Sequence, residues 1–572
     1  MVYYLYMPSI VGKRQAGKTY YYLVESARVQ GKPRIVSQQY LGSAEEVVAK
    51  LTDAAAGEPV RSEHKAFGDL AAVWSMLERL DVVGTVDGVV SRRADALASV
   101  GTYIALATAN RIVAPCSKLA FADWWASTAG ARWLRLPRGA TDHRRFWNAM
   151  DRLSVADLRA IETKLGRRIV TEFGLDLTGL VLDMTNFATF IDSGNEKAPI
   201  AQRGRAKQKR VDLRLVGLGL VVTRDGGVPV LSHTYPGDRP DVTQFSAMID
   251  ELVARYRQLT TSVESLTIVY DAGQNSADNH ELVEDTGIGF IGSLPPSDHP
   301  ALLAIPKSRY RPVDADGDAG RYRGLTHVDT TVTALGVTRR AVLTHSTTLH
   351  AKQVRGLDQT LATVTGKLTA LQGRLARGRT RKSRAAVQTE IATICRHRWV
   401  SDIITTTLTG DKPAELRLTW RTDRRARTRL ENRIFGKRIL FTGHDDWPVT
   451  DIVAGYRSQS DVEAGFRQLK DTHVVSFSPM HHWTDQKIRV HVFYCVLALT
   501  IAHLMRREAE HADIHMSVRE LLNELSGIQE TVLLYHDGNK GRPRAKRMLT
   551  DMTWTQQKLA DLFNIHHYAP TR

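Results

Sequence analysis

Three acidic residues, far apart in the chain, are the strongest candidates for chemistry. Asp183 ends the apolar run 179–183, and Asp271 ends the apolar run 266–271. Both runs predict buried strands whose last residue places a carboxylate at the C-terminal edge of a sheet, where open α/β sheets tend to bind ligands. Glu463 lies in a third stretch, 456–470, that predicts a helix. Two strand-end carboxylates and one on a helix suit a hard cation, which prefers oxygen ligands.

The stretch 456–470 contains no proline and only one glycine. Steps of three, four, four and three residues put five polar side chains on one narrow helical stripe: Tyr456, Gln459, Glu463, Arg467 and Lys470. An adjoining apolar stripe, suited to packing against a sheet, holds Val462, Phe466 and Leu469. This helix is therefore expected to present Glu463 among cations and hydrogen-bonding groups.

Each of these features also has an ordinary structural interpretation. A stripe such as this one is often a solvated helix face stabilised by pairs such as Glu463 with Arg467. A single Asp at the end of a strand often caps a helix or begins a turn. The chemical interpretation therefore depends on all three acidic residues meeting at one place.

These acidic residues and their surroundings resemble the DDE transposases of bacterial insertion sequences, in the group marked by a Y-x2-R-x3-E-x6-K signature. Here the spacing is Tyr456-x2-Gln459-x3-Glu463-x6-Lys470, so Gln459 stands where Arg is usual. That exchange loses one positive charge and keeps a hydrogen-bond donor. The resemblance extends to the basic stretch 203–213, to the Tyr-Pro-Gly-Asp sequence at 235–238, and to the opening 20–42. It therefore spans most of the chain.

The resemblance implies a ribonuclease H-like catalytic domain in which Asp183, Asp271 and Glu463 hold two Mg²⁺ ions, with Mn²⁺ as a possible substitute. It implies a transposase that cleaves the ends of its element by phosphodiester hydrolysis and joins the freed 3′-hydroxyls to target DNA. The implied partners are double-stranded DNA, as terminal inverted repeats and as target, and a second copy of the chain in the DNA complex. DNA contacts are expected from nine residues: Tyr456, Gln459, Arg467, Lys470, Arg203, Arg205, Lys207, Lys209 and Arg210.

The composition agrees with a nucleic-acid partner. Lys and Arg number 78 against 61 Asp and Glu, which gives a net charge of +17. Such an excess predicts a polyanionic partner, and no basic amphipathic terminus supports a membrane surface instead. Three widely separated cysteines show no metal or disulfide pattern and fit a reducing cytoplasm. The resemblance implies a bacterial cytoplasm, with the protein at the nucleoid when bound to DNA. The longest apolar stretch, 492–505, is too short to span a bilayer and predicts a buried helix.

The pattern along the chain predicts five regions and an α/β fold. Residues 1–45 form a small β-rich segment. Residues 46–175 form a helical domain that is expected either to bind DNA or to be structural, with helices at 66–80, 94–112 and 155–173. Residues 176–300 follow the order βββαβαβ of a ribonuclease H-like fold, in which the strands that carry Asp183 and Asp271 are neighbours. Residues 301–450 interrupt this core as an α+β insertion, and 451–572 hold the Glu463 helix and a C-terminal helical region.

The insertion is predicted to contain a helical hairpin at about 349–398. Apolar residues at alternating four- and three-residue steps form a coiled-coil seam: Leu357, Leu361, Val364, Leu368, Leu371 and Leu375. A basic tip at 376–384 separates this helix from a returning one. The tip is expected either to clamp DNA or to be a solvated turn.

Other functional classes are disfavoured. The chain has no HExxH or Cys/His zinc spacing, no P-loop and no GxGxxG that opens a helix after a strand. Two alternatives to an active transposase stay open. One is a catalytically inactive, transposase-derived DNA-binding protein, for which Gln459 is the hint. The other is an oligomerisation protein built on the coiled coil, which conflicts with the strand-end acids.

Overall fold

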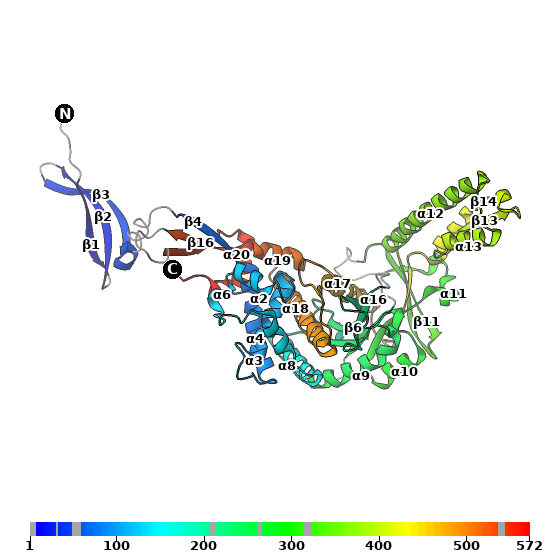
Figure 1. Cartoon of the computed structure of the whole chain (residues 1–572), viewed down its shortest axis with the longest axis horizontal. Helices are drawn as coiled ribbons and strands as arrows, with labels where there is room; N and C mark the ends of the chain where they lie inside the picture. The colour runs from blue at the N-terminus through cyan, green and yellow to red at the C-terminus, as the bar shows by residue number, and fades with distance from the viewer. Residues whose placement is uncertain are drawn as a thin grey trace, which may run out of the picture. The chain divides into compact units, whose positions relative to one another are not determined.

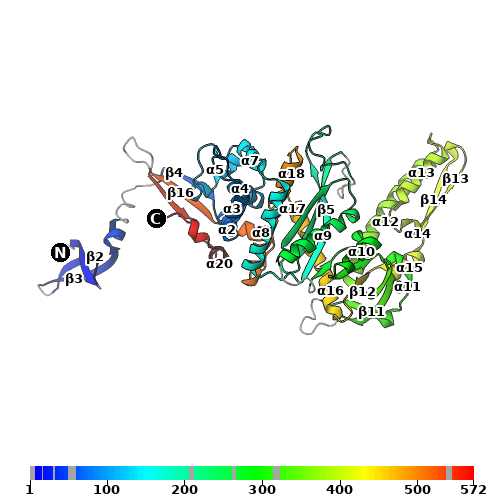
Figure 2. The ribbon, with the colours of Figure 1, turned by 90° about the horizontal axis from the view of Figure 1, so that it is seen from below.

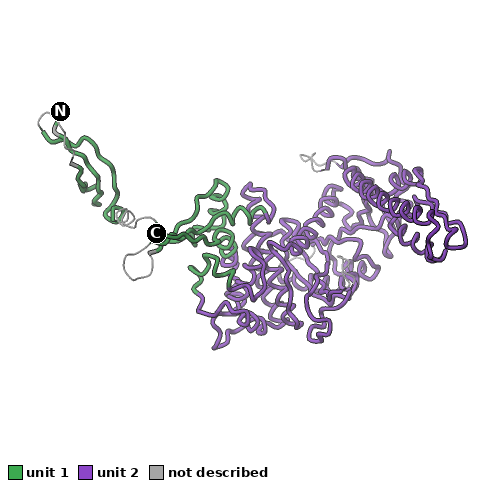
Figure 3. The backbone as a smooth tube through the Cα atoms, turned by 45° about the horizontal axis from the view of Figure 1, so that its top comes forward, with its two compact units in different colours: residues 1–75, 123–135, 520–572 green, residues 76–122, 136–519 purple. Residues whose placement is uncertain are grey.

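A computed structural model describes residues 7–15, 17–29, 32–48, 59–204, 212–259, 266–313, 322–535 and 544–571 of the chain. The chain divides into two units (Figure 3). Unit 1 comprises residues 1–75, 123–135 and 520–572, and unit 2 comprises residues 76–122 and 136–519. All three candidate acidic residues belong to unit 2.

A nine-stranded sheet organises unit 2, with the strand order β10-β11-β12-β15-β9-β8-β5-β6-β7. In chain order its strands are β5 (Gly179–Thr189), β6 (Arg214–Thr223), β7 (Pro229–Pro236), β8 (Thr267–Val269), β9 (Gly289–Leu294), β10 (Arg311–Pro312), β11 (Leu325–Ala334), β12 (Val337–Ser346) and β15 (Lys437–Thr442). Strands β5, β6 and β7 pair antiparallel, whereas β8 runs parallel to β5 and β9 runs parallel to β8. Because parallel neighbours need a crossover, the helices α9 (Asp241–Leu259) and α10 (Ala277–Asp285) connect them. This is the βββαβαβ order predicted from the sequence.

The sheet continues beyond β9 through four further strands. Strand β15 pairs antiparallel with β9, β12 with β15, and β11 with β12. Strands β10, β11, β12 and β15 all fall within 301–450, so this region extends the main sheet as well as interrupting the predicted core. Residues 347–436, between the neighbouring strands β12 and β15, leave the sheet. We call these residues the excursion segment.

The excursion segment builds its own core beside the sheet (Figures 1 and 2). Its elements are α12 (Thr347–Ala376), α13 (Arg384–Cys395), α14 (Val400–Ile403), β13 (Ile404–Thr409), β14 (Arg417–Thr422) and α15 (Arg424–Ile434). The predicted seam of α12 is buried, and the predicted returning helix covers only part of it. The seam packs against the short α13 and also against β14, where the side chain of Gln372 donates to the carbonyl of Leu418 at 2.9 Å. An apolar stripe can be covered by any apolar surface, so its spacing does not identify the covering element.

The other helices include α18 (Asp485–His511), which is the central helix of unit 2. It is apolar and long enough to cross a membrane on length and composition, but 94% of its most apolar window is buried inside the protein. It packs on α4 (Val100–Val113) and α8 (Val155–Phe173). The helix predicted at 94–112 begins later, because the Ser99 hydroxyl accepts the backbone N–H of Thr102 and caps α4.

Unit 1 contains two separate three-stranded sheets. One is β1 (Met7–Gln15), β2 (Lys18–Val29) and β3 (Lys32–Ser43), which matches the predicted β-rich opening. The other has the order β17-β16-β4 and joins Arg61–Ala66, Gln529–Tyr535 and Arg544–Leu549. Its fully buried Glu530 accepts ion pairs from Arg132 at 2.6 Å and Arg547 at 2.7 Å. This sheet was not predicted, because its strands come from opposite ends of the chain.

The shorter helices complete both units. They are α2 (Gly68–Arg79), α3 (Val82–Asp87), α5 (Phe121–Ser127), α6 (Gly130–Trp133), α7 (His143–Met150), α11 (Pro300–Leu303), α16 (Val449–Arg457), α17 (Gln459–Leu469), α19 (Val518–Ser526) and α20 (Trp554–Leu562).

A buried cation marks the packing of α18 in unit 2. The ammonium of Lys118 lies 4.6 Å from the ring centroid of Tyr494 on α18 and 5.2 Å from that of Phe146. Its nitrogen has no hydrogen-bond partner among the described residues. Burial, together with the nearby Arg111 guanidinium, lowers the pKa of Lys118 to about 7. The charged form of this side chain therefore destabilises the folded protein.

We predict that Lys118→Met stabilises the protein. Because folding lowers the pKa of Lys118, the unfolded chain binds more protons than the folded chain from about pH 7 up to the ordinary lysine pKa, and stability rises with pH across that window. Methionine should raise the free energy of unfolding at pH 7 by about 1–3 kcal/mol and remove this rise. Urea unfolding at several pH values measures both effects, with the exposed Lys164→Met as control. A variant less stable than the wild type would contradict the prediction.

Candidate active site

Asp183 and Asp271 lie level with each other on neighbouring strands. The parallel pairing of β5 with β8 matches Val181 to Val269. Two residues further along each chain, Asp183 and Asp271 therefore occupy one row and one face of the sheet. The pairing of Val269 with Ile291 on β9 brings Ser293 into the same row, and its hydroxyl donates to Oδ1 of Asp271 at 3.1 Å. The predicted neighbourhood of the two strands is thus observed.

The position of Asp183 along its strand differs from the prediction. Asp183 is not the last residue of its strand, because β5 pairs with β6 as far as Thr189. Asp271 does follow the end of β8 and precedes the short 3₁₀ helix 272–274. Its side chain makes no capping hydrogen bond there, so the helix-cap interpretation does not apply to it. Asp271 is exposed and Asp183 is partly buried.

The helix predicted over 456–470 is divided in two. Helices α16 and α17 meet at Ser458, whose hydroxyl donates to the carbonyl of Gly455. A serine that bonds back to the preceding turn competes with regular helical hydrogen bonding, which accounts for the break. Beyond it, the apolar stripe of Val462, Phe466 and Leu469 is buried as expected.

Polar contacts attach this helix pair to the face that carries both aspartates. The Tyr456 hydroxyl donates to Oδ1 of Asp271 at 3.2 Å, and the Lys470 ammonium donates to the hydroxyl of Thr185 at 2.8 Å. The Gln459 amide donates to the carbonyl of Leu182 at 3.4 Å. Thr185 is two residues beyond Asp183 on β5, so α17 covers the face that Asp183 occupies. Burial, reinforced by the charge of Asp271, raises the pKa of Tyr456.

The hydrogen bonds to Asp271 favour one of its oxygens. Both Ser293 and Tyr456 donate to Oδ1. Among the described residues, no donor reaches Oδ2. The two bonds therefore orient the carboxylate while leaving one oxygen available to a ligand.

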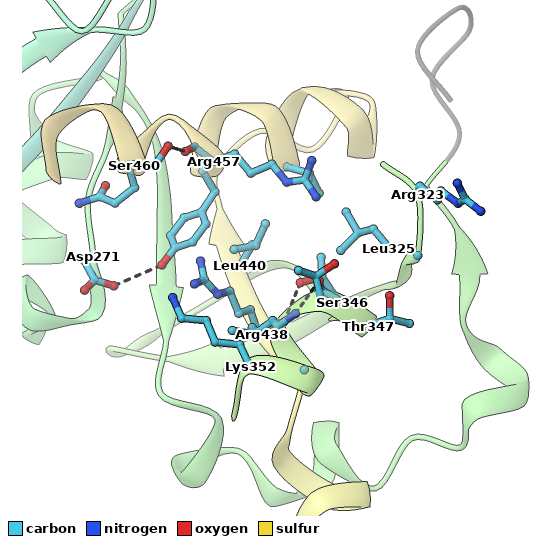
Figure 4. A pocket seen from close by; sticks show the side chains of 18 of the residues that line it. Asp271, Arg323, Leu325, Ser346, Thr347, Lys352, Arg438, Leu440, Arg457 and Ser460 are labelled. Carbon is cyan, nitrogen blue, oxygen red and sulfur yellow. Dashed lines mark hydrogen bonds between the residues drawn. The ribbon is translucent and has the colours of Figure 1, made fainter. Parts of the chain in front are cut away.

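A cavity of about 1110 Å³ opens beside Asp271 and is also lined by Glu463 of α17. Tyr456 and Gln459 belong to the same wall. Four cations line it as well, and the sequence reasoning did not find them: Arg323, Lys352, Arg438 and Arg457. Asp271, Lys352 and Arg438 lie around this space in Figure 4, and the Arg438 guanidinium is 5.4 Å from the Tyr456 ring centroid. Carboxylates opposite several cations are suited to holding a phosphate group beside a metal site.

The remaining predicted residues are less closely associated with the cavity. Asp183 and Lys470 lie on or against β5 and do not line it, and Arg467 is exposed on α17. Arg203 is exposed, while Arg205, Lys207, Lys209 and Arg210 fall outside the described residues. Within the described part of the chain, no three His, Cys, Asp or Glu side chains form a group that could hold a metal ion.

Comparison with known proteins gives limited information. No protein-family model matches the chain, and no curated protein matches it significantly. Among solved structures, the chain is similar to a piggyBac transposase in a synaptic complex with hairpin DNA, with a TM-score of 0.38, 9% sequence identity and 82% of each chain covered. This is a weak structural likeness to a transposase, and no residue role is drawn from it.

We predict that Lys470→Met weakens the docking of α17 on β5. The substitution removes a charged hydrogen bond to Thr185 and leaves its hydroxyl without that donor, which should lower the free energy of unfolding by about 1–2 kcal/mol. Arg467→Met is the matched control, because Arg467 is an exposed cation on the same helix, and it should change stability by less than about 0.5 kcal/mol. Urea unfolding of both variants measures the difference, and equal effects would show that the Lys470 contact contributes nothing.

Proposed function

We propose that this chain is a DNA transposase of an insertion sequence that cleaves and joins DNA by metal-dependent phosphodiester chemistry. One observation carries the proposal. Asp183 and Asp271 lie level on adjoining parallel strands, beneath a helix pair that brings Glu463 into the cavity beside Asp271. Two of the three carboxylates therefore line one cavity, and the third lies level with one of them on the adjoining strand.

The topology supports a ribonuclease H-like core for this function. Counted from β5, the strands β7-β6-β5-β8-β9 follow the order 3-2-1-4-5, with the first three antiparallel and the last two parallel to the first. This order places the first and fourth strands side by side. The acids that we assign to catalysis belong to those two strands.

The carboxylate chemistry of the proposed donors suits Mg²⁺ or Mn²⁺, and metal binding would have to bring Asp183 and Glu463 closer together than they are in this structure. Asp183, Asp271 and Glu463 would hold the ions, since carboxylate oxygens are preferred ligands of hard divalent cations, and Oδ2 of Asp271 is available. When bound, a pair of such ions would activate the attacking oxygen and stabilise the leaving oxygen at phosphorus. The chain itself orients Asp271 through Ser293 and Tyr456.

The remaining residues of the site act on DNA and on the position of Glu463. Lys470 and Gln459 fix α17 on β5, and thereby set the distance of Glu463 from the strands. Arg438, Lys352 and Arg457 provide positive charge for the phosphate that undergoes attack. Water attacks phosphorus and the 3′-oxygen leaves as a hydroxyl, which then attacks a target phosphodiester and displaces its 3′-oxygen. Double-stranded DNA with terminal inverted repeats is the proposed substrate, and a homodimer is the proposed form in the DNA complex.

A second candidate function is a DNA-binding protein derived from such an enzyme and lacking its chemistry. The observation in its favour is Gln459, which is buried, uncharged and has a carbonyl oxygen without a hydrogen-bond partner among the described residues. The family signature has an arginine at this position, so the chain has one cation fewer beside the acids.

We predict that Asp183→Asn and Glu463→Gln each abolish metal-dependent cleavage of DNA that carries the ends of the element, and leave DNA binding intact. Each change removes one negative charge from the metal ligands, which should slow cleavage by roughly a thousand-fold because contacts of this kind contribute several kcal/mol to the transition state. Gel assays of strand cleavage with Mg²⁺ or Mn²⁺, and after chelation with EDTA, measure the loss. Asp250→Asn, an exposed change on α9, is the control and should cleave like the wild type.

The outcomes separate the two functions. Cleavage by Asp183→Asn at the wild-type rate would disprove the assignment of the acidic residues. Tight binding of the element ends by the wild type, without nicking in either metal, would establish the non-catalytic function instead.

A further inference from the structure

The positive charge of the chain is concentrated in the excursion segment. Residues 347–436 contain 19 Lys and Arg against 7 Asp and Glu, a net charge of +12 out of +17 for the whole chain. The segment leaves the sheet between β12 and β15 and packs around a core of its own. Its charge therefore lies on the surface of one small body, away from most of the acidic residues of the protein.

The carboxylates inside the segment do not neutralise this charge. Asp358 and Glu431 both pair with Arg427, and Glu390 pairs with Arg374 and Lys382. The other ion pairs of the segment are Arg384–Asp411, Lys412–Glu415 and Arg429–Asp423, at 3.7–4.0 Å. Among the described residues, most of the 19 cations have no carboxylate partner.

Helix α15 arranges some of these cations in a regular stripe. Arg425, Arg429 and Arg433 follow one another at four-residue intervals, so they share one face of the helix. All three are exposed, whereas Leu430 and Ile434 on the other side of the helix are buried in the core of the segment. Each four-residue step rises about 6 Å, so the stripe extends along about 12 Å, a length over which a DNA duplex presents several phosphates.

The C-terminal end of α15 lies beside the candidate active site. Ile434, the last residue of α15, lines a second cavity of about 260 Å³ together with Arg398, Arg438 and Asp271. Arg438 also lines the larger cavity that contains Glu463. Arg398 and Arg438 thus place positive charge in a cavity that the end of α15 shares with the carboxylate that we assign to cleavage.

We propose that the excursion segment, through the Arg425, Arg429 and Arg433 stripe of α15, binds the sugar–phosphate backbone of the DNA duplex that is cleaved at Asp271. This inference rests on the proposed function for the identity of the substrate. Guanidinium groups bond phosphate oxygens in pairs, and such contacts hold DNA in register without reading its sequence. The arginines therefore position any duplex, and recognition of the element ends belongs to other residues.

The test measures duplex binding by the full-length protein as a function of salt. The triple variant Arg425→Gln, Arg429→Gln, Arg433→Gln should reduce the slope of log affinity against log salt concentration by about three and weaken binding at 0.1 M salt roughly a hundred-fold. The loss should be equal for a random 40-bp duplex and for one carrying the element end. The corresponding Arg→Lys variant keeps the charges and should keep the slope, which a purely structural role of the arginines would not produce.

The control removes the same charge from another helix of unit 2. Lys164, Arg167 and Arg168 are exposed cations on α8, and their replacement by Gln should alter the slope by less than about one. An unchanged slope in the α15 variant, with binding and cleavage otherwise intact, would overturn the inference and leave the proposed function standing. Absence of duplex binding by the wild type would instead overturn the proposed function, and this inference with it. Thermal unfolding verifies that both variants fold.

Discussion

The parallel pairing of β5 with β8 is the constraint on which the candidate site depends. Only three residue pairs define it, yet they set Asp183 and Asp271 level and on the same face. A slip of one residue in this register would turn Asp271 to the opposite face of the sheet, away from Tyr456 and α17. The buried residues of the two strands prevent such a slip, because Val181, Ile268 and Val269 would lose their places in the core. The geometry of the carboxylates is thus determined by apolar packing several residues away.

The two faces of β5 and its neighbour β6 pack against different helices. Met184 points toward α9, since a side chain added at its β6 neighbour Gly219 would meet Met248 of that helix. Asp183 and Thr185 point toward α17, which is attached by the bond of Lys470 to Thr185. Helix α9 therefore completes the core on one face, while α17 covers the row of polar residues that contains Asp183 on the other. This division explains why β5 is not simply apolar throughout, although it lies in the middle of a nine-stranded sheet.

The sequence was informative where a pattern is local. The period of 155–173 predicted α8 with the observed ends, and the apolar runs before the two aspartates predicted adjoining strands. The sequence did not predict features that depend on which other element packs against a segment. Strand β5 continues past Asp183 because β6 pairs with it, and the seam of α12 is buried by β14 as well as by a helix. The break at Ser458 depends on one hydroxyl bonding to Gly455, which helical periodicity does not reveal.

The cations of the cavity show why the sequence predicted the acidic residues of the site but not its basic residues. Arg323 precedes β11, while Lys352, Arg438 and Arg457 come from α12, β15 and α16, so no short stretch of sequence contains them together. The fold brings them together because β12, β15 and β9 are neighbours and α16 packs on β9 and β15. The two aspartates, by contrast, are held by backbone hydrogen bonds between strands. Glu463, Lys352 and Arg457 are carried on helices, whereas Arg438 is on β15 and Arg323 precedes β11. The acidic and the basic residues of the cavity thus depend on different packing contacts, which is why the strand patterns could predict the aspartates and not the cations around them.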